Sequence, residues 1–165
     1  MRDEQRIELP KIDGHYCFAC GTANPIGLNL HFYRIGDLIC TEVTLGKYHV
    51  GWQNMAHGGI ISTLLDEVMS WTIIYTKKVF LVTRRMEIKY IKPVLIDVPL
   101  TVKGRLMGEV RKPFIAAKAE LIDDQGTILA RSNGRFASLT KEERLLIPED
   151  MKKQFSLLFD RFSSP

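Results

Sequence analysis

The sequence predicts an α+β fold in which an antiparallel sheet of about six strands wraps around one long central helix, followed by a C-terminal helix. Three observations predict it: an uninterrupted helical pattern at 58–77, alternating apolar and polar segments on both sides of that helix, and short turns between consecutive segments. Short turns make neighbouring strands antiparallel. A single apolar helix is best buried when the sheet curves around it.

The composition is that of one globular domain. The chain has 165 residues, of which 45% are hydrophobic and 25% charged, and these values are ordinary for a soluble protein. Its first residues are charged and no apolar stretch reaches the length of a membrane span, so we expect neither a secretory signal nor a membrane partner. Three cysteines, an odd number, suit a reducing compartment and predict a cytoplasmic location.

The chain begins with a polar arm at 1–15, expected to be irregular, and continues into a turn-rich segment that contains Cys17-Phe-Ala-Cys20-Gly. A C-x-x-C pair supplies two of the four ligands of a structural zinc site. Cys40 and a histidine at 15, 31 or 49 could complete the set, but they form no second pair with the usual spacing. A redox dithiol would need a βαβ context that is missing. We therefore interpret the cysteines as anchors of a tight turn, and expect no metal and no cofactor.

The segment 28–45 alternates apolar and polar residues on both sides of a Gly-Asp dipeptide, which predicts a β-hairpin with a two-residue turn. Pairing across this turn sets Tyr33 opposite Cys40 and His31 opposite Glu42. His31 is therefore interpreted as a cross-strand partner of Glu42 rather than as a catalytic residue.

The central helix follows His57 and has a wide apolar face. Its polar residues form one narrow stripe, which is either the solvated side of an ordinary helix or, if the fold surrounds the helix, a place for chemistry. At the entrance, Gly58 and Gly59 let another group approach the backbone, and the first N–H groups of a helix lack partners within it. With the helix dipole, these amides suit a carbonyl oxygen that gains negative charge. The polar stripe comprises Ser62, Thr63, Asp66, Glu67 and Ser70.

The spacing of His57 and Asp66 has a geometric consequence. They are nine residues apart, so on a helix they point to opposite sides and lie about 13 Å apart along the axis. One chain cannot bring both to the same atom. A site that uses the glycine amides and the Asp66 carboxylate must combine two copies of the helix across a two-fold axis. The sequence therefore predicts an obligate homodimer, which could also pair into a dimer of dimers.

Four strand-like segments follow the central helix, at 81–91, 98–109, 114–123 and 127–138. In the first of them, strict alternation places odd-numbered residues such as Thr83 on one face and even-numbered residues such as Tyr90 on the other. The tail at 148–162 has the pattern of a short amphipathic helix that docks on the domain or its partner, or serves as a lid.

The net charge of +4 is unevenly distributed. The segment 77–118 holds eleven Lys and Arg against three acids and is +8, whereas the remainder is −4. Such a field suits a phosphate-bearing partner, although solvated strand faces also carry such charges. No nucleic-acid-binding motif accompanies the basic segment, so nucleic acid is not an expected partner. The candidate substrate-binding residues are Asn54, Arg84, Arg85, Lys89, Arg111 and Lys112.

Several short motifs occur in one order along the chain: Cys17-Phe-Ala-Cys-Gly with Asn24-Pro-Ile-Gly-Leu, His57-Gly-Gly-Ile with Leu65-Asp-Glu, and Val82-Thr leading to Tyr90-Ile-Lys-Pro. Their order and spacing resemble those of the PaaI-like hotdog-fold acyl-CoA thioesterase superfamily. The resemblance covers 16–139 and implies a hotdog domain there, between the N-terminal arm at 1–15 and a C-terminal helical extension at 140–165. It also implies a homodimer.

The resemblance implies hydrolysis of an acyl- or aryl-CoA thioester to the free acid and CoA, at a site shared across the dimer. In the family, the His-Gly-Gly turn supplies an oxyanion-binding amide, a carboxylate nine residues after the histidine acts as general base or nucleophile, and a Ser or Thr on the next strand positions water or the carboxylate. These roles fall on His57, Gly58 with Gly59, Asp66 and Thr83. Several members have asparagine six residues before the histidine, where this chain has Gly51.

Two alternatives to a thioesterase stay open. A non-catalytic acyl-CoA-binding or sensing protein would have the same fold, and Gly51 is consistent with it. A hydratase or dehydratase has less support, because the carboxylate position and the strand threonine fit hydrolysis better.

Overall fold

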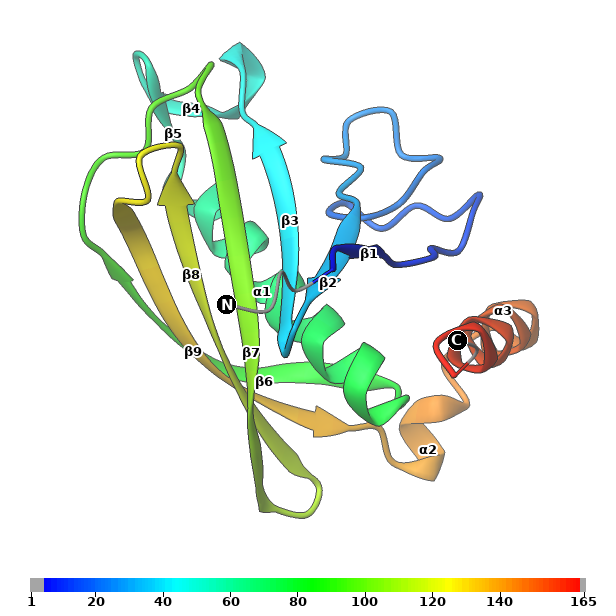
Figure 1. The fold of residues 1–165 in the computed structure, drawn as a ribbon. Helices are drawn as coiled ribbons and strands as arrows, with labels where there is room; N and C mark the ends of the chain where they lie inside the picture. Colours follow the sequence, from blue (N-terminus) through cyan, green and yellow to red (C-terminus); the bar gives the residue numbers. More distant parts are fainter. Residues whose placement is uncertain (1–4, 164–165) are drawn as a thin grey trace.

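The computed structural model describes residues 5–163, with the side chain of Glu109 excepted. Within these residues, seven strands form one antiparallel sheet that curves around the central helix (Figure 1), in the order β1-β2-β3-β7-β8-β9-β6. The predicted α+β fold with a central and a C-terminal helix is confirmed. The sheet strands are β1 (Ile7–Glu8), β2 (Phe32–Ile35), β3 (Leu38–Thr44), β6 (Leu81–Tyr90), β7 (Pro99–Arg111), β8 (Phe114–Asp123) and β9 (Ile128–Ser138).

The remaining elements lie at the ends of the sheet. A 3₁₀ turn at Lys47–His49 leads into the two-stranded hairpin of β4 (Val50–Trp52) and β5 (Met55–Ala56), just before α1 (Gly58–Lys77). After β9 come α2 (Lys141–Arg144) and α3 (Glu149–Arg161). No helix in the described part of the chain has the length and apolar character needed to span a lipid bilayer.

Helix α1 spans the range that its apolar periodicity predicted. It ends where Lys78 takes a positive φ of 53° and donates its backbone N–H to Ile74 O, a left-handed cap. One face lies against β7, where a Cβ on Gly104 would come within 2.4 Å of Thr72 Oγ1 and 2.7 Å of Val68 Cγ1. Glycine at 104 therefore lets the helix approach the sheet closely. The buried residues of the helix are Ile61, Leu64, Leu65, Val68, Met69, Trp71, Thr72 and Ile73.

Strand β6 lies at the edge of the sheet and contains a β-bulge. Thr83 pairs with Phe136 and Arg85 pairs with Arg135, so Arg84 is an extra residue in the ladder. Strict alternation predicted Thr83 and Tyr90 on opposite faces, and this prediction is wrong. Both side chains reach α1, because the bulge between them shifts the alternation by one residue.

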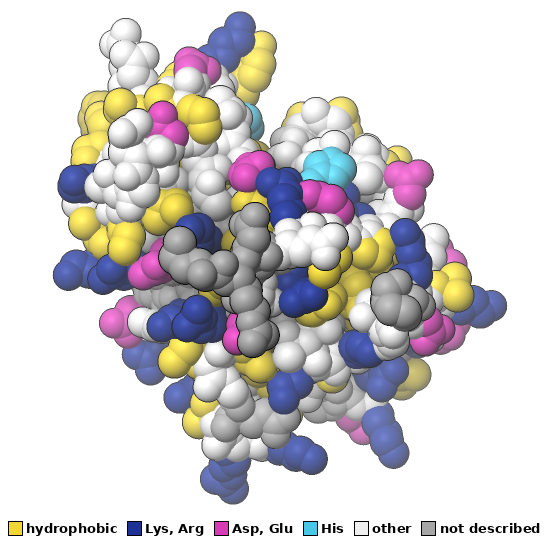
Figure 2. Space-filling model, in the orientation of Figure 1, with side chains coloured by type: hydrophobic (Ala, Val, Ile, Leu, Met, Phe, Trp, Pro, Cys, Tyr) yellow, Lys and Arg dark blue, Asp and Glu magenta, His cyan; other side chains and the backbone are white. Residues whose placement is uncertain are grey.

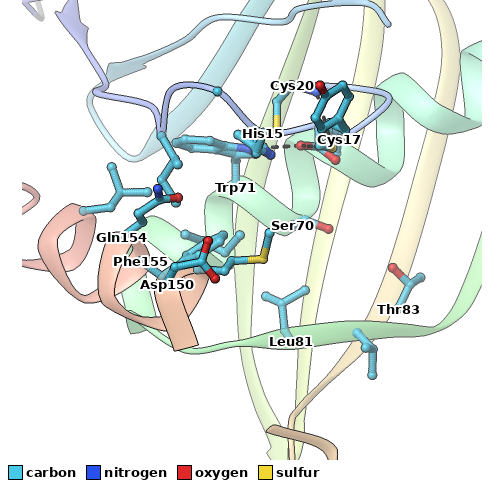
Figure 3. A pocket seen from close by; sticks show the side chains of 18 residues that line it. His15, Cys17, Cys20, Ser70, Trp71, Leu81, Thr83, Asp150, Gln154 and Phe155 are labelled. Carbon is cyan, nitrogen blue, oxygen red and sulfur yellow. Dashed lines mark hydrogen bonds between the residues drawn. The ribbon is translucent and has the colours of Figure 1, made fainter. Parts of the chain in front are cut away.

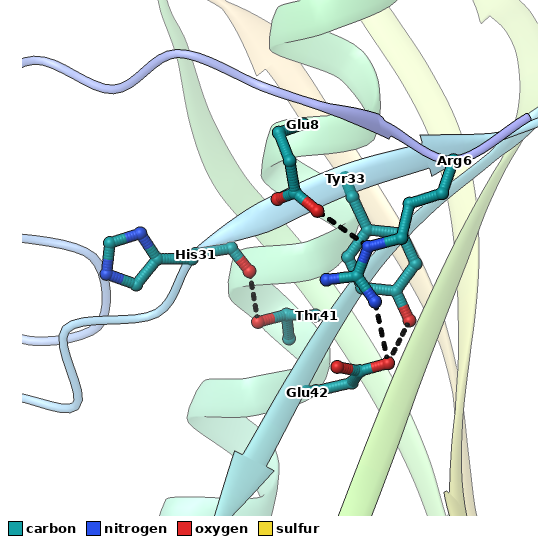
Figure 4. Close-up of polar contacts among 6 residues, drawn as sticks. All are labelled: Arg6, Glu8, His31, Tyr33, Thr41 and Glu42. Carbon is teal, nitrogen blue, oxygen red and sulfur yellow. Dashed lines mark hydrogen bonds and ion pairs between the residues drawn. The ribbon is translucent and has the colours of Figure 1, made fainter.

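The hairpin of β2 and β3 is confirmed, with Tyr33 opposite Cys40. Part of the N-terminal arm is not irregular as expected, because β1 pairs with β2 and raises the strand number from six to seven. The predicted partnership of His31 with Glu42 is wrong (Figure 4): Glu42 Oε1 binds Arg6 Nη1 and Tyr33 Oη, both at 3.0 Å. Strand β2 begins one residue after His31, whose carbonyl accepts a hydrogen bond from Thr41.

Helix α3 docks on the end of α1 and the start of β6 through aromatic side chains. Phe155 and Phe159 lie 5.2 and 5.9 Å from the ring of Phe80, measured between ring centroids. Phe162 contacts Tyr75 in α1 edge to face, at 5.1 Å. The predicted amphipathic tail helix is therefore present, and it forms one wall of a cavity beside α1.

Candidate active site

The carboxylate of Asp66 is held between α1 and β6. Thr83 Oγ1 donates a hydrogen bond of 2.8 Å to Asp66 Oδ1, and the bulge in β6 is what aims Thr83 at the helix. Burial raises the pKa of Asp66 above its usual value, and the bond from Thr83 offsets part of that rise. The result is an oriented carboxylate whose second oxygen can take a proton from water.

The entrance of α1 is organised by His57. Its backbone is extended (φ −65°, ψ 136°), and its Nδ1 accepts a hydrogen bond of 2.9 Å from the Gly59 N–H. The Gly59 amide is therefore already bonded, whereas the N–H of Gly58, the first helical residue, has no acceptor within the helix. Tyr90 Oη and Ser62 Oγ both bind the Gly58 carbonyl oxygen, at 3.1 and 2.9 Å. These two hydrogen bonds hold the Gly58 peptide in place through its carbonyl oxygen.

Gly51 lies directly against this turn. A Cβ on Gly51 would be 3.1 Å from His57 Cα and 3.2 Å from His57 Cδ2, which is tighter than ordinary van der Waals contact. The imidazole therefore occupies the space beside position 51, and a larger residue there would have to displace it.

The glycine turn and Asp66 do not meet within this chain. Both lie on α1, so Gly58 and Asp66 are separated by about 12 Å along the helix axis. The structure brings Asp66 together with Thr83, and His57 together with Gly59, as two separate groups.

A cavity of about 900 Å³ lies beside Thr83, between α1, β6, α3 and the N-terminal loop. Figure 3 shows the N-terminal loop and Trp71 on one side, Leu81 and Thr83 on another, and α3 closing a third side. Most of the wall is apolar, including Trp71, Phe155 and Leu158. Such a volume and lining suit the apolar part of a small-molecule ligand.

The wall of this cavity also contains a cluster that sequence reasoning missed. The ligand atoms of Cys17, Cys20 and Glu67 all lie within 4.8 Å of one another. Burial raises the pKa of Glu67 to about 7. The hydrogen bond from the Cys20 thiol lowers the pKa of Cys17 to about 5, and the same bond raises the pKa of Cys20. The C-x-x-C motif was visible in the sequence, but its carboxylate partner lies 50 residues away from Cys17.

Of the other candidate ligands for a zinc site, His15 lines the same cavity, whereas Cys40 and His49 lie elsewhere. Cys40 is buried in β3 opposite Tyr33, and His49 Nδ1 accepts a hydrogen bond from the Gly46 N–H. The interpretation of the C-x-x-C as a turn anchor is supported by Gly21, whose N–H donates to Cys17 O at 2.9 Å.

The predicted substrate-binding residues are exposed and do not converge on one place. Figure 2 shows Lys and Arg side chains spread among acidic ones over the face of the molecule that it draws. Arg84 forms an ion pair of 2.7 Å with Glu143 in α2, and Arg85 lies 3.8 Å from Glu87. Asn54 has a positive φ of 64° in the turn between β4 and β5. Arg111 is the last residue of β7, Lys112 lies in the turn between β7 and β8, and Lys89 lies on β6.

The fold and part of the sequence match known proteins. Residues 53–130 match the family model of the thioesterase superfamily. A solved structure of a thioesterase superfamily protein is similar, with a TM-score of 0.68 and 23% identity over 74% of this chain and 60% of that chain. The matched region thus spans three fifths of that protein's length. No curated protein sequence matches this chain.

Two further structures are similar. The PaaI protein of the E. coli phenylacetic acid degradation operon has a TM-score of 0.62 and 15% identity, over 68% of this chain and 81% of that chain. A hypothetical thioesterase of Streptococcus pneumoniae TIGR4, solved with coenzyme A, has a TM-score of 0.57 and 20% identity over 62% and 81%. The hotdog fold and the predicted resemblance to PaaI-like thioesterases are confirmed.

Proposed function

Starting from the hotdog fold shared with PaaI-like thioesterases, we propose that this protein hydrolyses the thioester bond of an acyl- or aryl-CoA. The observation that carries the proposal is the Asp66 carboxylate, bonded to Thr83 at 2.8 Å beside a large apolar cavity. A similar structure was solved with coenzyme A, which supports this class of substrate. The acyl group would lie in the cavity, and the CoA part would lie outside it.

The proposed reaction needs a base and an oxyanion site. Asp66 takes a proton from water as the water oxygen attacks the thioester carbonyl carbon, a role worth about 10²–10⁴-fold in rate. The carbonyl oxygen gains negative charge and binds the Gly58 N–H, and loss of one such donor costs about 2.7–4 kcal/mol in comparable sites. The C–S bond then breaks, and the CoA sulfur leaves with the proton from Asp66. Direct attack by the carboxylate, giving a mixed anhydride, is the variant.

The proposal requires a homodimer, because Gly58 and Asp66 are too far apart on one helix. Strand β6 supports a specific arrangement. It pairs with β9 on one side and with no strand on the other within residues 5–163, so its free edge can pair with the same edge of a second copy. Antiparallel β6 strands would bring the two α1 helices antiparallel as well, with each glycine turn near the acid of the other copy.

The CoA phosphates need cationic partners, and we assign them to the exposed basic residues. Arg84 is the weakest candidate because Glu143 already pairs with it. Arg85, Lys89, Arg111 and Lys112 remain candidates, since guanidinium and ammonium groups bind phosphate by charge-assisted hydrogen bonds. Asn54 lies in the turn between β4 and β5, and His57 directly precedes Gly58.

The test of the function is release of free thiol from a panel of acyl- and aryl-CoA thioesters. Asp66→Asn should lower kcat by about 10²–10⁴-fold because the base is lost. Asp37→Asn is the control, an exposed acid in the turn between β2 and β3 and away from the cavity lining, and it should leave turnover near the wild-type rate. Equal turnover by wild type and Asp66→Asn would show that Asp66 is not the base.

The shared site can be tested by mixing two inactive variants. Gly58→Pro removes the proposed oxyanion N–H, and proline is tolerated at the first helical position after an extended residue such as His57. In a mixed dimer of Asp66→Asn with Gly58→Pro, one of the two sites is intact, so random mixing should restore about one quarter of wild-type activity. No restoration in a dimer shown to exchange subunits would argue for a site within one chain.

A non-catalytic acyl-CoA-binding protein is the second candidate, favoured by Gly51. Position 51 carries no side chain, and a Cβ there would lie 3.1 Å from His57 Cα, so the orienting asparagine of several family members is missing at this position. This reading predicts saturable binding of acyl-CoA in calorimetry without thiol release from any member of the panel.

A further inference from the structure

We propose that Cys17, Cys20 and Glu67 bind a Zn²⁺ ion in the wall of the cavity, with the fourth coordination position facing the cavity. The three ligand atoms come from two elements that are distant in sequence, and they lie within 4.8 Å of one another. In a tetrahedral zinc site with bonds of about 2.0–2.3 Å, ligand atoms are separated by roughly 3.3–3.8 Å. Movements of about 1 Å would therefore close the cluster on the ion.

The loop that carries the two cysteines is already shaped as a metal-binding turn. Cys20 donates its backbone N–H to Cys17 Sγ at 3.5 Å, a bond that favours a thiolate. Gly21 donates to Cys17 O at 2.9 Å and has no room for a side chain, because a Cβ there would lie 2.5 Å from His15 O. The turn thus brings both sulfur atoms to one side.

The third ligand is oriented by a residue that does not itself bind the ion. Trp71 Nε1 donates a hydrogen bond of 3.1 Å to Glu67 Oε1 from one turn further along α1. Cys17 Sγ lies 3.9 Å from the same oxygen. Outer partners of this kind, which fix the direction of a ligand, are typical of zinc sites.

The charges around the cluster also suit a divalent cation. Two thiolates and a carboxylate would place three negative charges in one largely buried spot, which is costly unless cations offset them. Lys11 Nζ lies beside the loop and donates to Cys20 O at 2.9 Å and to Leu30 O at 2.7 Å. One divalent ion together with the Lys11 ammonium would make this group neutral.

The ligand set selects the metal. Thiolates are soft ligands that favour zinc over Mg²⁺ or Ca²⁺, and a mixed sulfur and oxygen set of three suits tetrahedral Zn²⁺ with one further ligand. His15 and Ser70 line the same cavity, and Figure 3 shows His15 next to Cys17. The ion would join the N-terminal loop to α1 and so fix one wall of the cavity.

The test uses the full chain, reduced and freed of metal, and does not depend on enzymatic activity. Titration with Zn²⁺ against a chromophoric chelator should give about one bound ion per chain. Co²⁺ in place of Zn²⁺ should give a thiolate-to-metal charge-transfer band and the visible bands of a tetrahedral centre. Fewer than about 0.1 ions per chain, or bound Co²⁺ without a thiolate band, would overturn the proposal.

Variants locate the site. Loss of an outer partner weakens metal binding by roughly 10–100-fold. Glu67→Gln and Cys17→Ser each remove a direct ligand, so each should weaken Zn²⁺ binding by more than that. Asp66→Asn and Cys40→Ala are the matched controls, since each removes a neighbouring acid or the remaining cysteine and should leave affinity unchanged. Equal loss in the controls would contradict the assignment. Should a ligand variant fail to fold, the cobalt spectrum of the wild type decides alone.

Discussion

Asp66 and Glu67 are consecutive acids on α1, yet they belong to two different regions of the molecule. Asp66 points to β6, where Thr83 binds it. Glu67 points to the N-terminal loop, where Cys17 lies 3.9 Å away, and is held by Trp71. A turn of about 100° per residue is enough to separate them. One helix therefore serves two groups with different chemistry, and a substitution at either acid should affect only its own side.

The largest expected effect is on the affinity for zinc, on the Glu67 side of α1. Trp71→Phe removes the N–H that orients Glu67. It keeps an aromatic ring to stack on Phe32, whose centroid lies 4.3 Å from that of Trp71 in the wild type. Zinc affinity should fall about 10–100-fold, measured by chelator competition, while the pH of the acidic limb of kcat/KM, which reports the pKa of Asp66, does not move. A shift of that limb would show that the two regions are coupled.

The next effect lies on the Asp66 side. Thr83→Val keeps the shape of the side chain and removes the hydrogen bond to Asp66. A hydrogen bond to a charged group contributes about 1.5–3 kcal/mol, so kcat/KM should fall by roughly tenfold or more. Zinc affinity should not change, and an unchanged kcat/KM would remove Thr83 from the site.

The pH dependence provides an independent readout of the same bond. Because burial raises the pKa of Asp66 above its usual 3.8, kcat/KM of the wild type should fall as the pH drops through a value above 3.8. The bond from Thr83 lowers that pKa, so in Thr83→Val the acidic limb of the profile should move to higher pH. A shift in the opposite direction would contradict the assignment of Asp66 as the titrating base.

The smallest effect expected is on stability. A raised pKa in the folded state means that the fold disfavours the charged form of Asp66. The contribution of Asp66 to the stability of the wild type should thus be greatest below its unfolded-state pKa, and it should decrease as the pH rises through its folded-state pKa. Asp66→Asn avoids this loss, so its Tm should exceed that of the wild type at pH 7, by about 2–4 °C for each kcal/mol. Calorimetry at pH 4 and pH 7 checks that the difference grows with pH.

Helix α1 and the long strands were predictable because their signals are local. The apolar period of α1 extends over many residues without a breaker, and turns marked the ends of β8 and β9. The two residues of β1 carry no such signal, since their pairing with β2 depends on tertiary contacts. For the candidate site, motifs pointed to His57 and Asp66, and the roles of these residues stay a prediction.

Other parts of the site depend on geometry that no local pattern contains. Alternation in β6 implied the wrong face for Thr83, because a bulge needs only one extra residue and no special residue type. The partnership of Glu67 with Cys17 joins positions 50 residues apart. The bond from Gly59 to His57 Nδ1, which leaves Gly58 as the available amide, also required atomic positions.

Because of the bulge at Arg84, the number of residues between Asp66 and Thr83 decides whether the two side chains face each other. Asp66 and Thr83 are 17 positions apart. With the extra residue in β6, this spacing places the Thr83 side chain on the side of the sheet that faces α1. Deleting position 84 would restore regular pairing and rotate Thr83 away from the acid, although neither partner had been replaced. Relatives whose spacing differs by one residue would then need a compensating irregularity elsewhere in the strand, or a different hydroxyl, to orient the same carboxylate.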